Sequence, residues 1–131
     1  MNYRDIIYET DGRLAYITLN RPEKLNALSN NLRGEVMDAM REAEHDDEIG
    51  VIVLRGAGRS FSAGYDLTPA RAAGEVDLVN PRSLLPETGT THPGQQQWAR
   101  HVVMTNMTIW ELAKPVVAQV HGHCLAGGTE L

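Results

Sequence analysis

The sequence predicts an α/β fold built as one domain. The chain has 131 residues, an ordinary length for a single domain. Short apolar stretches of strand length alternate along it with stretches of helical periodicity. Two of the predicted strands run directly into glycine-rich loops. The predicted order is therefore strand, strand, helix, strand, loop, helix, strand, loop.

The first two strands are predicted at residues 6–9 and 14–19. Asp11 and Gly12 between them predict a turn, because both residues tolerate a positive φ. The second strand carries apolar side chains at both alternating sets of positions, so we expect it to be buried on two faces. Pro22 ends this strand because proline has no amide to donate to a neighbouring strand.

The first predicted helix is capped by Ser29 or Asn30 and ends near Asp46. Apolar residues recur in it at helical spacing and are expected to face the core: Leu32, Val36, Ala39, Met40 and Ala43. The charged residues between them are expected to face solvent: Arg33, Glu35, Asp38, Arg41 and Glu42.

A continuous apolar stretch at residues 50–54 predicts a third strand, again buried on both faces of the sheet. It runs into a glycine-rich loop at 56–64. Residues 69–95 are polar and interrupted by Pro81, Pro86 and Pro93, which predicts a mobile loop.

The rest of the chain predicts a second helix, a strand and a second glycine-rich loop. The helix is expected over 96–112, with these residues facing inward: Trp98, Val102, Met104, Thr105, Ile109 and Leu112. A strand is expected at 116–121 and a glycine-rich loop at 122–128. Residues 129–131 predict the first turn of another helix.

Composition narrows the classes of function. With 17 acidic and 12 basic residues the formal net charge is −5, which argues against a general nucleic-acid binder. One cysteine, Cys124, allows no intrachain disulfide and favours a reducing compartment. No apolar stretch has the length of a membrane span, and residues 1–9 lack a signal-peptide pattern, so we expect a cytoplasmic protein without a membrane partner. His121 and His123 have too few neighbouring ligands to predict a metal site.

The chemistry concentrates in two glycine loops and one carboxylate. Backbone N–H groups near Gly64–Tyr65 and Gly127–Gly128 are suited to hold a developing oxyanion, with Glu130 close by to move a proton. Spacing alone favours a simpler interpretation, namely two tight turns and a glutamate placed near the positive end of a helix dipole.

Three segments resemble the enoyl-CoA hydratase/isomerase (crotonase) family. Residues 20–28 resemble its N-R-P-x-x-x-N-A-L segment, and residues 60–67 resemble its F-x-A-G-x-D-[IL] loop. Residues 114–131 resemble K-P-V-I-A-x-V-x-G followed by G-G-G-x-E-L. The three occur in the family's order and cover the chain apart from 69–95. The resemblance implies a spiral of β-β-α units, with residues 1–131 forming its N-terminal part and the fold incomplete at the C-terminus.

The resemblance also implies roles for individual residues. The oxyanion donors fall on the amides of Tyr65 and Gly127, and the first catalytic glutamate falls on Glu130. Contacts with substrate and coenzyme A fall on Lys24, Leu25, Ala27, Ala63, Gly64, Asp66, Leu67, Thr68 and Gly128. Thr68 stands where the family has a lysine and Ala126 where it often has a third glycine. Asp66 has an alternative role, slightly favoured, in tying down its loop.

The implied activity is hydration of an α,β-unsaturated acyl-CoA, with coenzyme A as part of the substrate, no tightly bound cofactor and no metal. Family members are longer than this chain, and their second catalytic acid follows the segment seen here. A homotrimer or hexamer is implied. The alternatives are an enoyl-CoA isomerase, another crotonase-type lyase or hydrolase, and a non-catalytic acyl-CoA-binding or truncated fragment.

Overall fold

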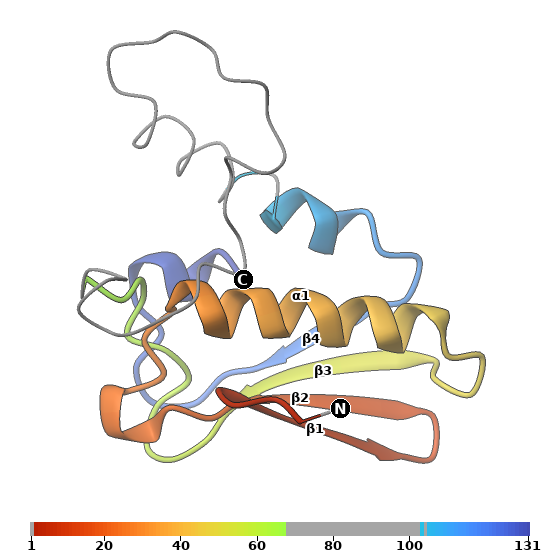
Figure 1. Ribbon diagram of the computed structural model, residues 1–131, viewed down its shortest axis with the longest axis horizontal. Helices are drawn as coiled ribbons and strands as arrows, with labels where there is room; N and C mark the ends of the chain where they lie inside the picture. Colours follow the sequence, from red (N-terminus) through yellow and green to blue (C-terminus); the bar gives the residue numbers. More distant parts are fainter. Residues whose placement is uncertain (1, 68–102, 104) are drawn as a thin grey trace, which may run out of the picture.

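The structure is a computed structural model that describes residues 2–67, 103 and 105–131 (Figure 1). The predicted mobile loop at 69–95 lies outside the described residues, as do Thr68, Trp98, Val102 and Met104. Residues 105–110 are helical, in agreement with the predicted second helix. Within it Thr105 is buried, and Ile109 and Leu112 pack against the core.

Four strands form one mixed sheet in the order β1-β2-β3-β4. Their bounds are β1 Ile6–Asp11, β2 Leu14–Leu19, β3 Val51–Gly56 and β4 Val116–Gln119. β1 and β2 form an antiparallel hairpin, whereas β2, β3 and β4 run parallel. The parallel strands therefore end at the same edge of the sheet, and the loops that follow them start side by side (Figure 1).

The hairpin turn is as the sequence predicts, with β1 two residues longer than expected. Gly12 occupies the turn with φ +56, a conformation that glycine adopts without a Cβ penalty. β4 is shorter than expected and ends at Gln119 rather than His121.

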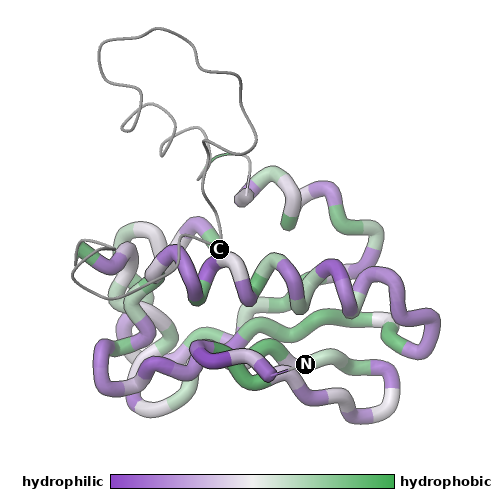
Figure 2. Tube along the Cα trace, viewed as in Figure 1, coloured by the Kyte–Doolittle hydropathy of each residue, from purple (hydrophilic) through white to green (hydrophobic). Residues whose placement is uncertain are grey.

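Helix α1 (Asn30–His45) covers one face of the sheet (Figure 1). Its cap is Ser29, whose hydroxyl accepts a hydrogen bond from Leu32 N at 3.1 Å. All five apolar positions predicted to face inward are buried. They meet the fully buried sheet residues Ala15, Ile17, Leu19, Ile52 and Leu54. Figure 2 shows the result as polar and apolar residues alternating along α1 above a largely apolar β3.

The predicted burial on two faces is wrong for β3 and holds only in part for β2. In β3, Ile52 and Leu54 are buried while Val51 and Val53 between them are half-buried. In β2, Leu14 and Tyr16 are likewise only half-buried, whereas Thr18 on the same face is buried. The reason is that α1 covers one face of the sheet, and no described helix covers the other as completely.

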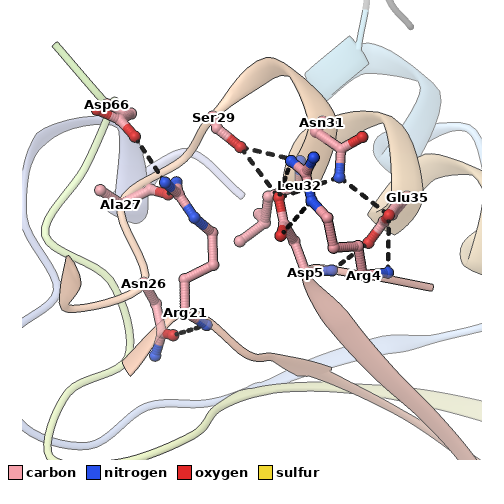
Figure 3. Close-up of polar contacts among 10 residues, drawn as sticks. All are labelled: Arg4, Asp5, Arg21, Asn26, Ala27, Ser29, Asn31, Leu32, Glu35 and Asp66. Atoms are coloured by element: carbon pink, nitrogen blue, oxygen red, sulfur yellow. Dashed lines mark hydrogen bonds and ion pairs between the residues drawn. The ribbon is translucent and has the colours of Figure 1, made fainter. Parts of the chain in front are cut away.

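Two charged residues of α1 are buried, which corrects the prediction that they face solvent. The carboxylate of Glu35 accepts hydrogen bonds from the amides of Arg4 at 3.0 Å and Asp5 at 2.7 Å, so it satisfies the backbone just before β1 (Figure 3). Arg33 lies with its guanidinium carbon 5.6 Å from the centre of the Tyr65 ring. Asp38 and Arg41 do face solvent, as predicted.

The N-terminal segment is anchored to α1 through Asp5. Burial alone would raise the pKa of its carboxyl group, but hydrogen bonds from Arg4 and Asn31, each at 3.0 Å, outweigh burial and lower the pKa below its usual value. At the other end of α1, Lys114 Nζ donates to the carbonyl oxygens of Ala43 and Asp46 at 2.7 and 2.6 Å. This lysine therefore ties the end of α1 to the start of β4.

Candidate active site

The candidate site is built from the three loops at the carboxyl ends of β2, β3 and β4, beside the N-terminal end of α1 (Figure 1). This edge of a parallel sheet is where α/β proteins commonly bind ligands. The loops after β3 and β4 run alongside each other. Ser62 N donates to His123 O at 3.0 Å, and Leu125 N donates to Ser62 O at 3.1 Å. The two predicted glycine loops are therefore direct neighbours.

Asn26 fastens the loop after β2 to the loop after β3. Its side-chain oxygen accepts from Arg21 N at 2.8 Å, and its nitrogen donates to the carbonyl oxygens of Ala57 and Ser60 at 2.9 Å each. The residue is 0% exposed and has φ 53, a left-handed conformation that asparagine tolerates better than most residues. Asn26 lies in the motif segment at 20–28, but the motif by itself does not predict this structural role.

A buried ion pair makes a second connection between these loops. Arg21 Nη2 lies 2.9 Å from Asp66 Oδ2, and both side chains are buried (Figure 3). Arg21 also donates to the carbonyl oxygen of Ala27 at 2.7 Å. This is the arrangement expected if Asp66 holds its loop in place, the alternative that the sequence left open.

The backbone around Tyr65 sets the direction of its amide. Leu28 N donates to Gly64 O at 2.7 Å, and Asp66 N donates to Leu28 O at 3.1 Å. Successive peptide groups of an extended chain point to opposite sides, so the Tyr65 N–H is turned away from Leu28. Gly64, at φ +96, packs against the second glycine loop, since a Cβ there would lie 3.4 Å from Gly127 N.

Gly127 presents a buried amide next to this segment. It lies in the short helix η3 (Ala126–Thr129), and its N–H donates to none of the residues that the structure describes. A buried N–H without a protein acceptor is costly unless a ligand or water takes the bond. The predicted helical turn at 129–131 starts earlier than expected, at Ala126, with Glu130 as the residue that ends η3. Ala126 has φ 45, which explains why a glycine suits this position.

Glu130 contacts the loop after β3 through the side chain of Tyr65. The Tyr65 hydroxyl donates to Glu130 Oε2 at 2.7 Å. Burial, and then the hydrogen bond and charge of Glu130, raise the pKa of the Tyr65 phenol above its ordinary value. Sequence reasoning valued Tyr65 for its backbone amide alone, and no spacing pattern links residues 65 positions apart.

Comparison with known proteins identifies the family. Residues 9–131 match the family model for enoyl-CoA hydratase/isomerase. The chain belongs to this family. It is 36% identical over 126 residues to the hydroxycinnamoyl-CoA hydratase-lyase of Pseudomonas fluorescens, covering 96% of this chain and 41% of that protein. It is 33% identical over 132 residues to the short-chain-enoyl-CoA hydratase of Clostridium acetobutylicum, covering 100% of this chain and 44% of that protein.

The fold is that of the first part of a crotonase. A crystal structure of an enoyl-CoA hydratase/isomerase from Xanthobacter autotrophicus Py2 matches with a TM-score of 0.76 and 38% sequence identity, covering 98% of this chain and 43% of that one. The chain thus spans less than half the length of these relatives. The predicted α/β fold and the predicted resemblance are both confirmed.

The residues matched to crotonase coenzyme-A contacts surround the candidate site at different depths. Gly64 and Gly128 are buried, Leu25, Ala27 and Ala63 are half-buried, and Lys24 and Leu67 are exposed. Asp66 is half-buried as a whole residue, although its side chain is only 9% exposed. Leu67 is 93% exposed, so its side chain has space to meet a ligand. These roles, like those of Glu130 and the two amides, stay predictions.

The described residues contain neither a metal-binding cluster nor a membrane-spanning helix. Among them, no three histidine, cysteine or acidic side chains gather as a metal site. His121 Nε2 lies 2.7 Å from Gly58 O, a contact between two loops. No helix in the described ranges is both long and apolar enough to cross a bilayer.

Proposed function

We propose that the protein hydrates an α,β-unsaturated acyl-CoA. The observation that supports this most directly is the buried Gly127 N–H, which has no acceptor in the described ranges and lies against the Tyr65 segment with Glu130 close by. Backbone amides of this kind stabilise an oxygen that becomes negative during reaction. Membership of the enoyl-CoA hydratase/isomerase family supplies the substrate class, a coenzyme-A thioester.

In the proposed reaction the thioester oxygen accepts hydrogen bonds from the amides of Tyr65 and Gly127. Water attacks the β-carbon, its proton passes to a carboxylate, and the electrons of the double bond shift toward the thioester oxygen. The resulting enolate then takes a proton at the α-carbon. Loss of one donor of this type typically costs about 2.7–4 kcal/mol of transition-state stabilisation. Glu130, with a second acid that this sequence does not contain, holds the water or moves the proton.

Coenzyme A enters as part of the substrate, and no tightly bound cofactor is proposed. Its contacts are proposed to fall on Lys24, Leu25, Ala27, Ala63, Gly64, Asp66, Leu67, Thr68 and Gly128. The full protein is proposed to form a homotrimer or hexamer and to work in the cytoplasm, without a nucleic-acid or membrane partner.

The test is Glu130→Gln in the full-length protein with crotonyl-CoA, followed by loss of absorbance of the conjugated thioester. We expect a fall in kcat of about 100-fold or more, because a positioned acid or base contributes about that much. Glu48→Gln is a matched control, since Glu48 is exposed and lies in the turn after α1. Unchanged hydration by Glu130→Gln removes Glu130 from the mechanism.

The same assay separates the alternatives. Turnover of a 3-enoyl-CoA to the conjugated thioester without hydration identifies an isomerase. Binding of crotonyl-CoA with no turnover of either substrate identifies a non-catalytic acyl-CoA-binding protein and refutes the proposed function.

A further inference from the structure

The side chain of Tyr65 contacts both the candidate catalytic carboxylate, Glu130, and the second glycine loop at Gly127. Its hydroxyl donates to Glu130 Oε2 at 2.7 Å, while its ring lies against Gly127, where an added Cβ would clash with the ring atoms. We propose that Tyr65 is a positioning residue, whose phenol holds the Glu130 carboxylate beside the oxyanion-binding amides. The inference rests on the proposed function and adds to it a side chain that the family motif leaves variable.

The ring is fixed from more than one direction. Gly127 lies against it, and the guanidinium carbon of Arg33 lies 5.6 Å from its centre. Asn106, from the helical segment 105–110, is near enough to lower the pKa of the phenol, against burial and Glu130, which raise it. A tyrosine ring has only two side-chain torsions to restrict, so these contacts suffice to hold the hydroxyl in one direction.

The carboxylate has no other such support in the part of the chain that the structure describes. There, the Tyr65 hydroxyl is the group that hydrogen-bonds to the Glu130 side chain. A hydroxyl that donates to a carboxylate forms a short, charge-assisted bond. It occupies Oε2 and leaves Oε1 to address a water or a substrate proton. Glu130 itself is exposed at the end of η3, so without this bond its side chain is expected to sample several rotamers.

Arg33 adds a charge behind the ring. It is 3% exposed, and its Nη2 has no hydrogen-bond partner among the described residues. Burial lowers the pKa of its guanidinium from the ordinary value, while the neighbouring Tyr65 and Glu130 act against this. The positive charge therefore faces the same phenol and carboxylate and attracts Glu130 toward the position that Tyr65 gives it.

The experiment is a double-mutant cycle in the full-length protein with crotonyl-CoA. Tyr65→Phe keeps the backbone amide and removes only the hydroxyl. We expect kcat to fall about tenfold, the loss expected for a hydrogen bond to a charged group, with KM changed less than about threefold. In the Glu130→Gln background, Tyr65→Phe is expected to change kcat less than about twofold, because a residue that acts through Glu130 has nothing left to position.

Tyr3→Phe is the matched control, because the Tyr3 hydroxyl also donates to a carboxylate, Asp38 Oδ2 at 3.1 Å. Asp38 belongs to α1 and is not part of the candidate site. We expect the kcat of Tyr3→Phe to equal that of the unaltered protein.

A readout independent of turnover is the titration of Tyr65 followed by carbon-13 NMR of labelled tyrosine. Its pKa is expected to fall in Glu130→Gln, since the carboxylate contributes to raising it.

Two results overturn the inference alone, provided that the unaltered protein hydrates crotonyl-CoA. One is that the fold-loss in kcat of the double variant equals the product of the losses of Tyr65→Phe and Glu130→Gln. The other is that Glu130→Gln leaves the pKa of Tyr65 unchanged. Absence of hydration and isomerisation by the unaltered protein overturns the proposed function, and the inference with it.

Discussion

Replacement of Asn26 by alanine tests whether one buried amide holds the active-site loops together. Asn26 makes three hydrogen bonds, to the backbone of Arg21, Ala57 and Ser60, and is completely buried. The change removes all three and leaves the backbone groups of both loops without these partners. The loop after β3, which contains Ala57 and Ser60, also carries Gly64 and Tyr65 a few residues further on. The prediction therefore concerns both stability and activity.

The expected cost follows from the contacts. Each of the three hydrogen bonds is worth about 1 kcal/mol net. The backbone at this position is left-handed, with φ 53, and this conformation costs alanine about 1 kcal/mol more than a residue that tolerates it. We therefore expect Asn26→Ala to lower the free energy of unfolding by about 4 kcal/mol, a large part of the 5–15 kcal/mol typical of a whole domain.

Urea denaturation of the full-length protein measures this loss. Asn30→Ala is the matched control, because Asn30 is the half-buried first residue of α1 and makes no side-chain hydrogen bond to the described residues. Its effect is expected to stay within about 0.5 kcal/mol, as for most substitutions away from such contacts. A loss below about 1 kcal/mol for Asn26→Ala, with an unchanged m-value, refutes the reasoning that Asn26 fastens the loops.

Two further predictions use other parts of the structure. Gly64→Ala is expected to destabilise the protein by about 3 kcal/mol and to lower hydration, because its φ is +96 and a Cβ would lie 2.8 Å from Leu125 O. Gly12→Ala, at φ +56 with nothing within 4 Å, should cost only about 1 kcal/mol, and equal urea midpoints for the two variants would contradict the contact argument. The lowered pKa of Asp5 means that its ionised form stabilises the fold fully above about pH 4 and that this stability is lost as the pH falls through the lowered value. Asp5→Asn should therefore lose less stability than the unaltered protein between pH 7 and acid pH in urea titrations, and parallel losses would show that Asp5 is not the group responsible.

The sequence by itself determined the elements and the family. Hairpin, first helix and third strand follow from local patterns: the turn at Gly12, the cap at Ser29 and the periodicity of the apolar residues. These patterns work because they depend on neighbours within a few residues. The three motif segments, in their order along the chain, were enough to predict the family and the part of its fold that is present.

Only the tertiary structure decided which polar side chains leave solvent and which partners they meet. Arg33 and Glu35 have the helical spacing of surface residues, yet both are buried because Tyr65 and the segment before β1 pack over them. The pair between Arg21 and Asp66 spans 45 positions and the bond between Tyr65 and Glu130 spans 65. Periodicity reports which way a residue points on its own element, whereas burial and pairing depend on what another part of the chain places in front of it.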